Sequence, residues 1–102
     1  MVVVLCCSCA TAGEPHMSAI ERQFVGKWEG ARHTDWFLPD HTWFMDFQPG
    51  DQPRGTWLIR DRRLTKTYSN GGSASYRIVS IDSQKLVIAD QHNFQYVLKR
   101  VP

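Results

Sequence analysis

Beyond Gly26, large apolar residues recur at every second position in several short segments of the chain. The alternation is clearest in residues 41–48, 55–60, 76–81 and 94–99. Successive side chains of a β-strand point to opposite faces, so this period of two predicts strands with one buried face. Turn-favouring residues separate these segments and no helical segment does, which excludes a parallel sheet with crossover helices. We therefore predict an all-β fold, an antiparallel meander of about seven strands.

The predicted sheet is expected to curl into a small barrel, either closed or incomplete. A flat sheet of this size would expose two edges and much of one aromatic face to water. The four Trp, five Phe and three Tyr of the chain are expected to fill most of the interior. An empty cavity of about 300 Å³ would cost about 7 kcal/mol, which rivals the ~5–15 kcal/mol stability of such a domain. We expect a small or open-ended pocket.

A short helix is predicted before the strands. Ser18-Ala19-Ile20-Glu21 has the form of a capping box, in which the Ser and Glu side chains each bind the other residue's amide. Ile20 and Phe24 are four residues apart and share a face, and Gly26 can end the helix. We expect about two turns lying across one end of the barrel.

The segment 1–17 differs from the rest of the chain. All three cysteines, Cys6, Cys7 and Cys9, lie there, behind the apolar run 2–5. A disulfide framework would spread cysteines through the fold, so this pattern is more typical of the end of an export signal. It resembles a bacterial lipoprotein signal, in which a small residue, here Ser8, precedes the cysteine that is lipidated. Residues 18–102 then form one domain.

The resemblance implies that a lipid on Cys9 tethers the protein to the bacterial envelope. Ala10 stands where an inner-membrane retention signal has Asp, so we expect the periplasmic side of the outer membrane. The basic start of such a signal is missing, so the natural signal is expected to begin upstream. No later apolar run approaches the ~20 residues that span a bilayer, so the lipid is the expected membrane attachment. The alternative is a frayed or vector-derived N-terminus, with His16-Met17 resembling a cloning junction.

Gly26-Lys27-Trp28, just after the predicted helix and at the start of the meander, resembles the first strand of the lipocalin-like (calycin) β-barrels. The resemblance covers roughly residues 24–100. In that family the Trp closes one barrel end and stacks on a basic residue of the last strand. Lys99 and Arg100 stand where that partner is expected, and a cation–π contact would hold it. The full-length family has eight long strands, whereas about seven short ones are predicted here.

Trp36 and Phe37 are the first candidate binding residues. We place them in a loop spanning His33 to His41, where large apolar side chains are unusual. They would form a lid or an anchor for a lipid, ligand or partner, since Trp combines a large contact area with a polar group. Alternatively, they fold back and cap one end of the barrel.

Arg60, Arg62 and Arg63 are candidate anion contacts. If Asp61-Arg62 forms a hairpin tip, Arg60 and Arg63 lie nearly opposite each other, which is unfavourable without an anion. Phosphate-bearing lipid headgroups are one conceivable partner and a solvated basic face is the alternative. A net charge of +2 is too weak to imply nucleic acid, and export would separate the protein from it.

The sequence predicts no enzyme, no metal and no cofactor. No segment resembles a strained nucleophile turn. His33, Asp35, Asp40 and His41 suit zinc chemically but have no recognisable ligand spacing.

Two classes of function remain. The first is an envelope-tethered, lipocalin-like binding domain for a small apolar or amphiphilic ligand. The second is an exported protein-interaction module, such as an inhibitor or assembly factor for an envelope protein, with a filled barrel.

Overall fold

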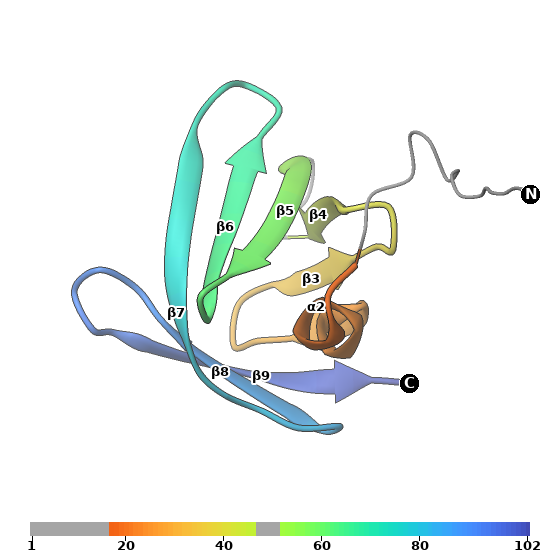
Figure 1. The fold of residues 1–102 in the computed structure, drawn as a ribbon, viewed down its shortest axis with the longest axis vertical. Coiled ribbons are helices and arrows are strands. Elements are labelled where there is room, and N and C mark those ends of the chain that lie inside the picture. The colour runs from red at the N-terminus through yellow and green to blue at the C-terminus, as the bar shows by residue number, and fades with distance from the viewer. Residues whose placement is uncertain (1–16, 47–51) are drawn as a thin grey trace, which may run out of the picture.

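The computed structural model describes residues 17–46 and 52–102, which form a closed antiparallel barrel with one short helix (Figure 1). Each strand pairs with the next one in sequence, and the first pairs with the last. The elements are α2 (Ala19–Phe24), β2 (Gly26–Glu29), β3 (Thr34–Phe37), β4 (Thr42–Asp46), β5 (Arg54–Arg60), β6 (Arg63–Tyr68), β7 (Ser73–Ile81), β8 (Lys85–Ala89) and β9 (Gln95–Val101). The predicted all-β meander with a short N-terminal helix is confirmed. The barrel is closed and has eight strands instead of about seven.

The additional strand is β3, which the sequence analysis placed in a loop. Its side chains alternate, with Asp35 and Phe37 buried and Thr34 and Trp36 on the other face. An aspartate at an inward position breaks the apolar alternation by which a strand is recognised. Its polar partners make this position tolerable, and the charged one, Lys66, lies 31 residues away in sequence.

The helix α2 covers one end of the barrel, as predicted. Its capping box is present, with the Ser18 Oγ accepting from the Glu21 amide at 3.3 Å. The buried Glu21 carboxylate accepts from the Ser18 amide at 2.9 Å and from the Ile59 amide of β5 at 2.8 Å. Phe24 packs edge-on against Phe37, with ring centroids 5.5 Å apart. The helix is therefore fixed to the barrel by both polar and apolar contacts.

Trp28 is fully buried next to this helix, and its partner is Arg100 instead of Lys99, which is exposed. The Arg100 guanidinium carbon lies 4.2 Å from the centroid of the Trp28 ring. Arg100 also donates hydrogen bonds to the carbonyls of Gln23 and Val25, which helix α2 leaves free at its C-terminal end. A Cβ at Gly26, where φ is +132°, would lie 2.6 Å from the Arg100 guanidinium. The Gly-x-Trp segment and the Arg of the last strand thus form one packed unit.

A bulge changes the faces of β7. The alternation in the sequence puts Tyr76, Ile78 and Ser80 on one face, but the register shifts between Ile78 and Ser80. Ile81 then pairs with the core residue Leu86, and Ser80 is exposed. An inserted residue of this kind reverses the faces that follow it.

Candidate binding site

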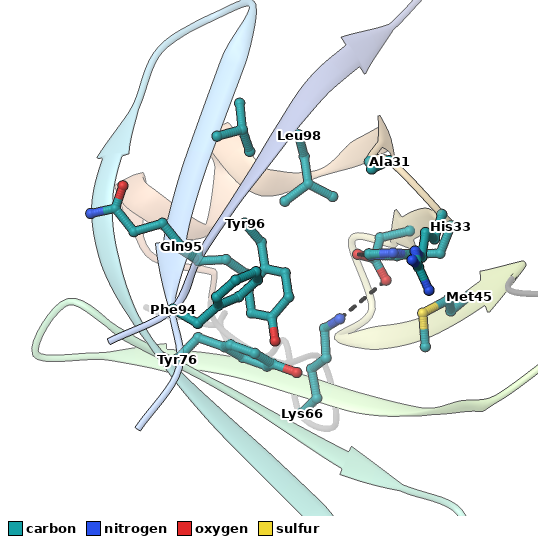
Figure 2. Close-up of a pocket in the computed structure, with 14 residues that line it drawn as sticks. Ala31, His33, Met45, Lys66, Tyr76, Phe94, Gln95, Tyr96 and Leu98 are labelled. Carbon is teal, nitrogen blue, oxygen red and sulfur yellow. Dashed lines mark hydrogen bonds and ion pairs between the residues drawn. The ribbon is translucent and has the colours of Figure 1, made fainter. Parts of the chain in front are cut away.

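A cavity of about 480 Å³ lies in the barrel (Figure 2). Small-molecule pockets range from about 300 to 1,000 Å³, so this volume suits a small ligand. Its walls come from the β2–β3 loop, from β9 with the residue before it, and from single residues of β3, β4, β6, β7 and β8. The lining residues are Gly30, Ala31, Arg32, His33, Asp35, Met45, Lys66, Tyr76, Ile88, Phe94, Gln95, Tyr96, Val97 and Leu98.

The two ends of the barrel interior differ. At the helical end, Phe24, Phe37 and Trp57 pack with ring centroids 5.2–6.0 Å apart. None of these three aromatic residues lines the cavity. The mouth of the cavity carries exposed residues, among them Arg32 and Phe94. Aromatic side chains thus fill one end of the interior, whereas they were expected to fill most of it, and the cavity lies beside that end.

A buried ion pair between Asp35 and Lys66 lies in the wall of the cavity (Figure 2). Lys66 Nζ and Trp43 Nε1 both donate to Asp35 Oδ1, at 3.1 and 3.0 Å. His33 Nε2 lies 3.1 Å from the other carboxylate oxygen. Asp35 is 1% exposed and Lys66 is 4% exposed. Burial of these charges is tolerable because the two are paired and the carboxylate has further polar partners in Trp43 and His33.

Aromatic rings surround the Lys66 ammonium. Its nitrogen lies 4.6 Å from the centroid of Trp43 and 5.5 Å from the centroids of Phe37 and Tyr76. Ring faces attract cations, and they do so more strongly where water is excluded. The rings and Asp35 together hold the ammonium beside the cavity.

Burial shifts the pKa values of the acidic and the basic group of this cluster in opposite directions. It would raise the pKa of Asp35, but the His33 hydrogen bond and the Lys66 charge outweigh it, so this pKa is below its ordinary value. Burial lowers the pKa of Lys66, and the Asp35 charge opposes that shift only in part. Burial, with smaller contributions from Tyr68 and Tyr96, raises the pKa of Tyr76 to about 12. The Tyr76 hydroxyl is protonated at neutral pH, as a tyrosine with the ordinary pKa also is, and can act as a hydrogen-bond donor.

The predicted binding residues Trp36 and Phe37 do not line this cavity. Both belong to β3, so the prediction that they lie in a loop is wrong. Phe37 is 1% exposed and belongs to the core. Trp36 lies on the opposite face of β3, stacked on Phe44 at 4.7 Å between centroids, with Lys27 Nζ 5.2 Å from its ring. Trp36 remains available for contact with a partner, but on the outside of the barrel.

Arg60, Arg62 and Arg63 lie at the β5–β6 hairpin, with Asp61 and Arg62 in the left-handed region at φ 54° and 57°. Arg60 and Arg63 are paired directly, as predicted, and Arg63 is paired in turn with Arg77 of β7. Directly paired residues share a face, so these three exposed arginines form a row across three strands. The Arg62 guanidinium instead donates to the Ile78 carbonyl at 3.3 Å.

Lys66 and Tyr76 were not predicted as site residues, and Asp35 was considered only as one of four possible zinc ligands. One signal was present: Lys66 falls between Leu64 and Tyr68 at alternate positions of β6, where an inward residue is expected to be apolar. A charge at such a position indicates a buried partner. The partner could not be identified, because the strand that carries Asp35 was not recognised.

A second buried acid–base contact lies beneath α2. His41 Nε2 is 3.1 Å from Glu21 Oε1, although the angles are poor for a hydrogen bond. His41 packs against Trp57 at 5.3 Å between ring centroids. Neither Glu21 nor His41 lines the cavity, so this contact belongs to the helical end of the barrel.

Within residues 17–46 and 52–102, no group of three or more His, Cys, Asp or Glu is arranged to hold a metal ion. No helix in this part of the chain has the length and apolar character to cross a membrane. Cys9, the predicted lipidation site, lies outside the described residues. Comparison with known protein families and with curated proteins finds no match to this chain.

Proposed function

We propose that this protein is a lipocalin-like binding domain that takes a small apolar or amphiphilic ligand into the barrel cavity. The observation that carries the proposal is the cavity itself: about 480 Å³, with apolar residues such as Ile88 and Leu98 in its wall beside a buried polar cluster. Binding sites of this kind are mostly apolar, with a few polar groups that orient the ligand. The Trp28–Arg100 contact and the closed barrel also agree with a lipocalin-like origin.

Filling the cavity should weaken this binding strongly. Ile88 lines the cavity, so Ile88→Trp adds bulk directly into it, and the affinity for the neutral fluorescent probe N-phenyl-1-naphthylamine should fall about tenfold or more. Thr56→Trp places the same side chain on an exposed position of β5 and should leave the affinity unchanged. The measurement is a fluorescence titration of both variants and the wild type, with thermal melts to verify folding. A folded Ile88→Trp variant with wild-type affinity would place binding elsewhere.

We also propose that a lipid on Cys9 tethers the domain to the bacterial envelope, on the periplasmic side of the outer membrane. The support is the position of Cys9 after Ser8 and an apolar run, in a chain with no cysteine after it. Expressed behind a complete signal, the Cys9→Ser variant should move from the membrane fraction to the soluble periplasm, and Cys6→Ser should not. Unchanged fractionation of Cys9→Ser would overturn the tether and leave the cavity proposal intact.

A second candidate is an interaction module for an acidic envelope protein. The supporting observation is the row of Arg60, Arg63 and Arg77, whose like charges repel across paired strands. Within the described ranges none of the three forms an ion pair with a carboxylate. An acidic surface would neutralise this row.

Binding of an anion to the arginine row should be measurable without the partner. Sulfate should raise the melting temperature more than chloride does at equal ionic strength, because a divalent anion can bridge neighbouring guanidinium groups. In Arg63→Gln, which removes the central charge, the extra effect of sulfate should largely disappear. Arg54→Gln, at an exposed position outside the row, is the matched control. Equal sulfate effects in both variants would show that the row is only a solvated surface.

A further inference from the structure

The Lys66 ammonium has hydrogen-bonding capacity that the described part of the protein does not use. An ammonium carries three N–H donors, and among the described residues only Asp35 accepts a hydrogen bond from it. The rings of Trp43, Phe37 and Tyr76 lie around the same nitrogen, and the side chain borders the cavity. A ligand in the cavity can therefore reach a buried donor.

Tyr76 supplies a second donor in the same wall. Its ring centroid lies 5.5 Å from Lys66 Nζ, and Figure 2 shows both side chains at one side of the cavity. No hydrogen bond joins its hydroxyl to another described residue, whereas the Tyr96 hydroxyl already donates to Asp90 at 3.1 Å. A tyrosine hydroxyl is protonated at neutral pH, so Lys66 and Tyr76 place an N–H and an O–H donor in the same wall of the cavity.

The charges beside the cavity decide whether the ligand atom that accepts these hydrogen bonds belongs to a charged or a neutral group. Asp35 and Lys66 neutralise each other, and the Asp35 oxygens already accept from Lys66, Trp43 and His33. A ligand carboxylate would bring a second negative charge beside a neutral buried pair, which is costly without a further buried cation. Arg32 also lines the cavity, but it is exposed at the mouth and not buried beside Asp35 and Lys66. A ketone or ester oxygen accepts the same hydrogen bonds and adds no charge.

Resting on the proposed cavity function, we propose that the ligand is an apolar molecule with a neutral carbonyl group, whose oxygen accepts hydrogen bonds from Lys66 and Tyr76. Its hydrocarbon part lies along Ile88 and Leu98, toward the exposed Phe94 at the mouth. The cavity thus selects a neutral carbonyl compound over a fatty acid of equal length.

Displacement of N-phenyl-1-naphthylamine by decan-2-one, decanoate and decane at pH 8 tests this selectivity. The ketone should bind about tenfold more tightly than either of the others, and Tyr76→Phe should reduce the affinity for the ketone severalfold without changing that for decane. Asp35→Leu/Lys66→Met, which removes both charges together, should bind the ketone no better than decane.

The outcomes separate the two proposals. If the probe binds but decanoate equals or exceeds the ketone, the cavity function stands and the carbonyl preference is overturned. The same holds if the ketone keeps its advantage in folded Tyr76→Phe and in the double variant. If neither the probe nor any of the three compounds binds the wild type, both proposals are overturned.

Discussion

Replacing Asp35 with leucine is expected to lower the free energy of unfolding by about 3–5 kcal/mol, because it leaves the Lys66 cation buried without a counterion. The same change removes the acceptor of the Trp43 Nε1 and His33 Nε2 hydrogen bonds. An unsatisfied buried donor adds about 1–3 kcal/mol. Urea denaturation followed by tryptophan fluorescence measures the loss. The control is Asp40→Ala, where the carboxylate is exposed and accepts hydrogen bonds from the amide and hydroxyl of Thr42.

The double variant Asp35→Leu/Lys66→Met shows how much of the stability loss comes from the unpaired Lys66 charge and how much from lost packing and hydrogen bonds. Removal of both members of a buried ion pair is often close to neutral, whereas removal of one is costly. The double variant should therefore be more stable than Asp35→Leu alone, even though it carries one more substitution. It should not regain full wild-type stability, because Trp43 and His33 still lack their acceptor. If the double variant is less stable than the single one, the unpaired charge is not the cause of the loss.

The sequence predicts most of this fold because its strongest signals are local. Alternation in β5 and β9, turn residues between strands and the capping box at Ser18 each depend on neighbours in the chain. The opposition of Arg60 and Arg63 followed from a two-residue turn and is confirmed. The burial of Trp28 against a basic residue of the last strand is also confirmed, with Arg100 as the partner.

The site was not predictable in the same way, because it depends on contacts between distant residues. Asp35 is acceptable at an inward position only because Lys66, thirty-one residues later, lies 3.1 Å from it. Without knowledge of that contact, the sequence of β3 resembles a polar loop that contains a Trp. The binding site was therefore predicted at Trp36. The bulge in β7 is likewise invisible in the alternation, since an extra residue changes the faces without changing the composition.

The two ends of the barrel interior differ in packing, since one is filled by aromatic rings and the other holds the cavity beside the charged cluster. One end of the barrel is closed to a ligand by the packed rings of Phe24, Phe37 and Trp57. The Asp35–Lys66 pair lies beside the cavity that remains. A cavity of this size lowers stability, since dry mutational cavities cost about 24 cal/mol per Å³ and open ones cost less. A protein is more readily left with this loss of stability where the cavity serves a function, such as the proposed binding of a ligand.

Trp28→Ala is expected to lower the free energy of unfolding by about 3–5 kcal/mol, since it empties a fully buried site next to α2. It also removes the Nε1 hydrogen bond to the Phe24 carbonyl at 2.8 Å and the ring that faces Arg100 at 4.2 Å. Trp28→Phe keeps an aromatic ring and loses the donor, so its cost should be intermediate. Urea denaturation of the wild type and both variants measures these losses, and the midpoint of Trp28→Phe should lie between those of the wild type and Trp28→Ala.

Trp36→Ala is the matched comparison, because it removes the same side chain from the outer face of the barrel. Its stacking on Phe44 is a cross-strand contact of a partly exposed pair, and such pairs contribute roughly 0.2–1 kcal/mol. Trp36→Ala should therefore remain within about 1 kcal/mol of the wild type, and it should bind N-phenyl-1-naphthylamine normally because Trp36 does not line the cavity. Equal losses of stability for Trp28→Ala and Trp36→Ala would contradict this division between the core and the outer face. A midpoint for Trp28→Ala close to that of the wild type would show that the Gly26–Trp28 segment and Arg100 do not hold the helical end of the barrel closed.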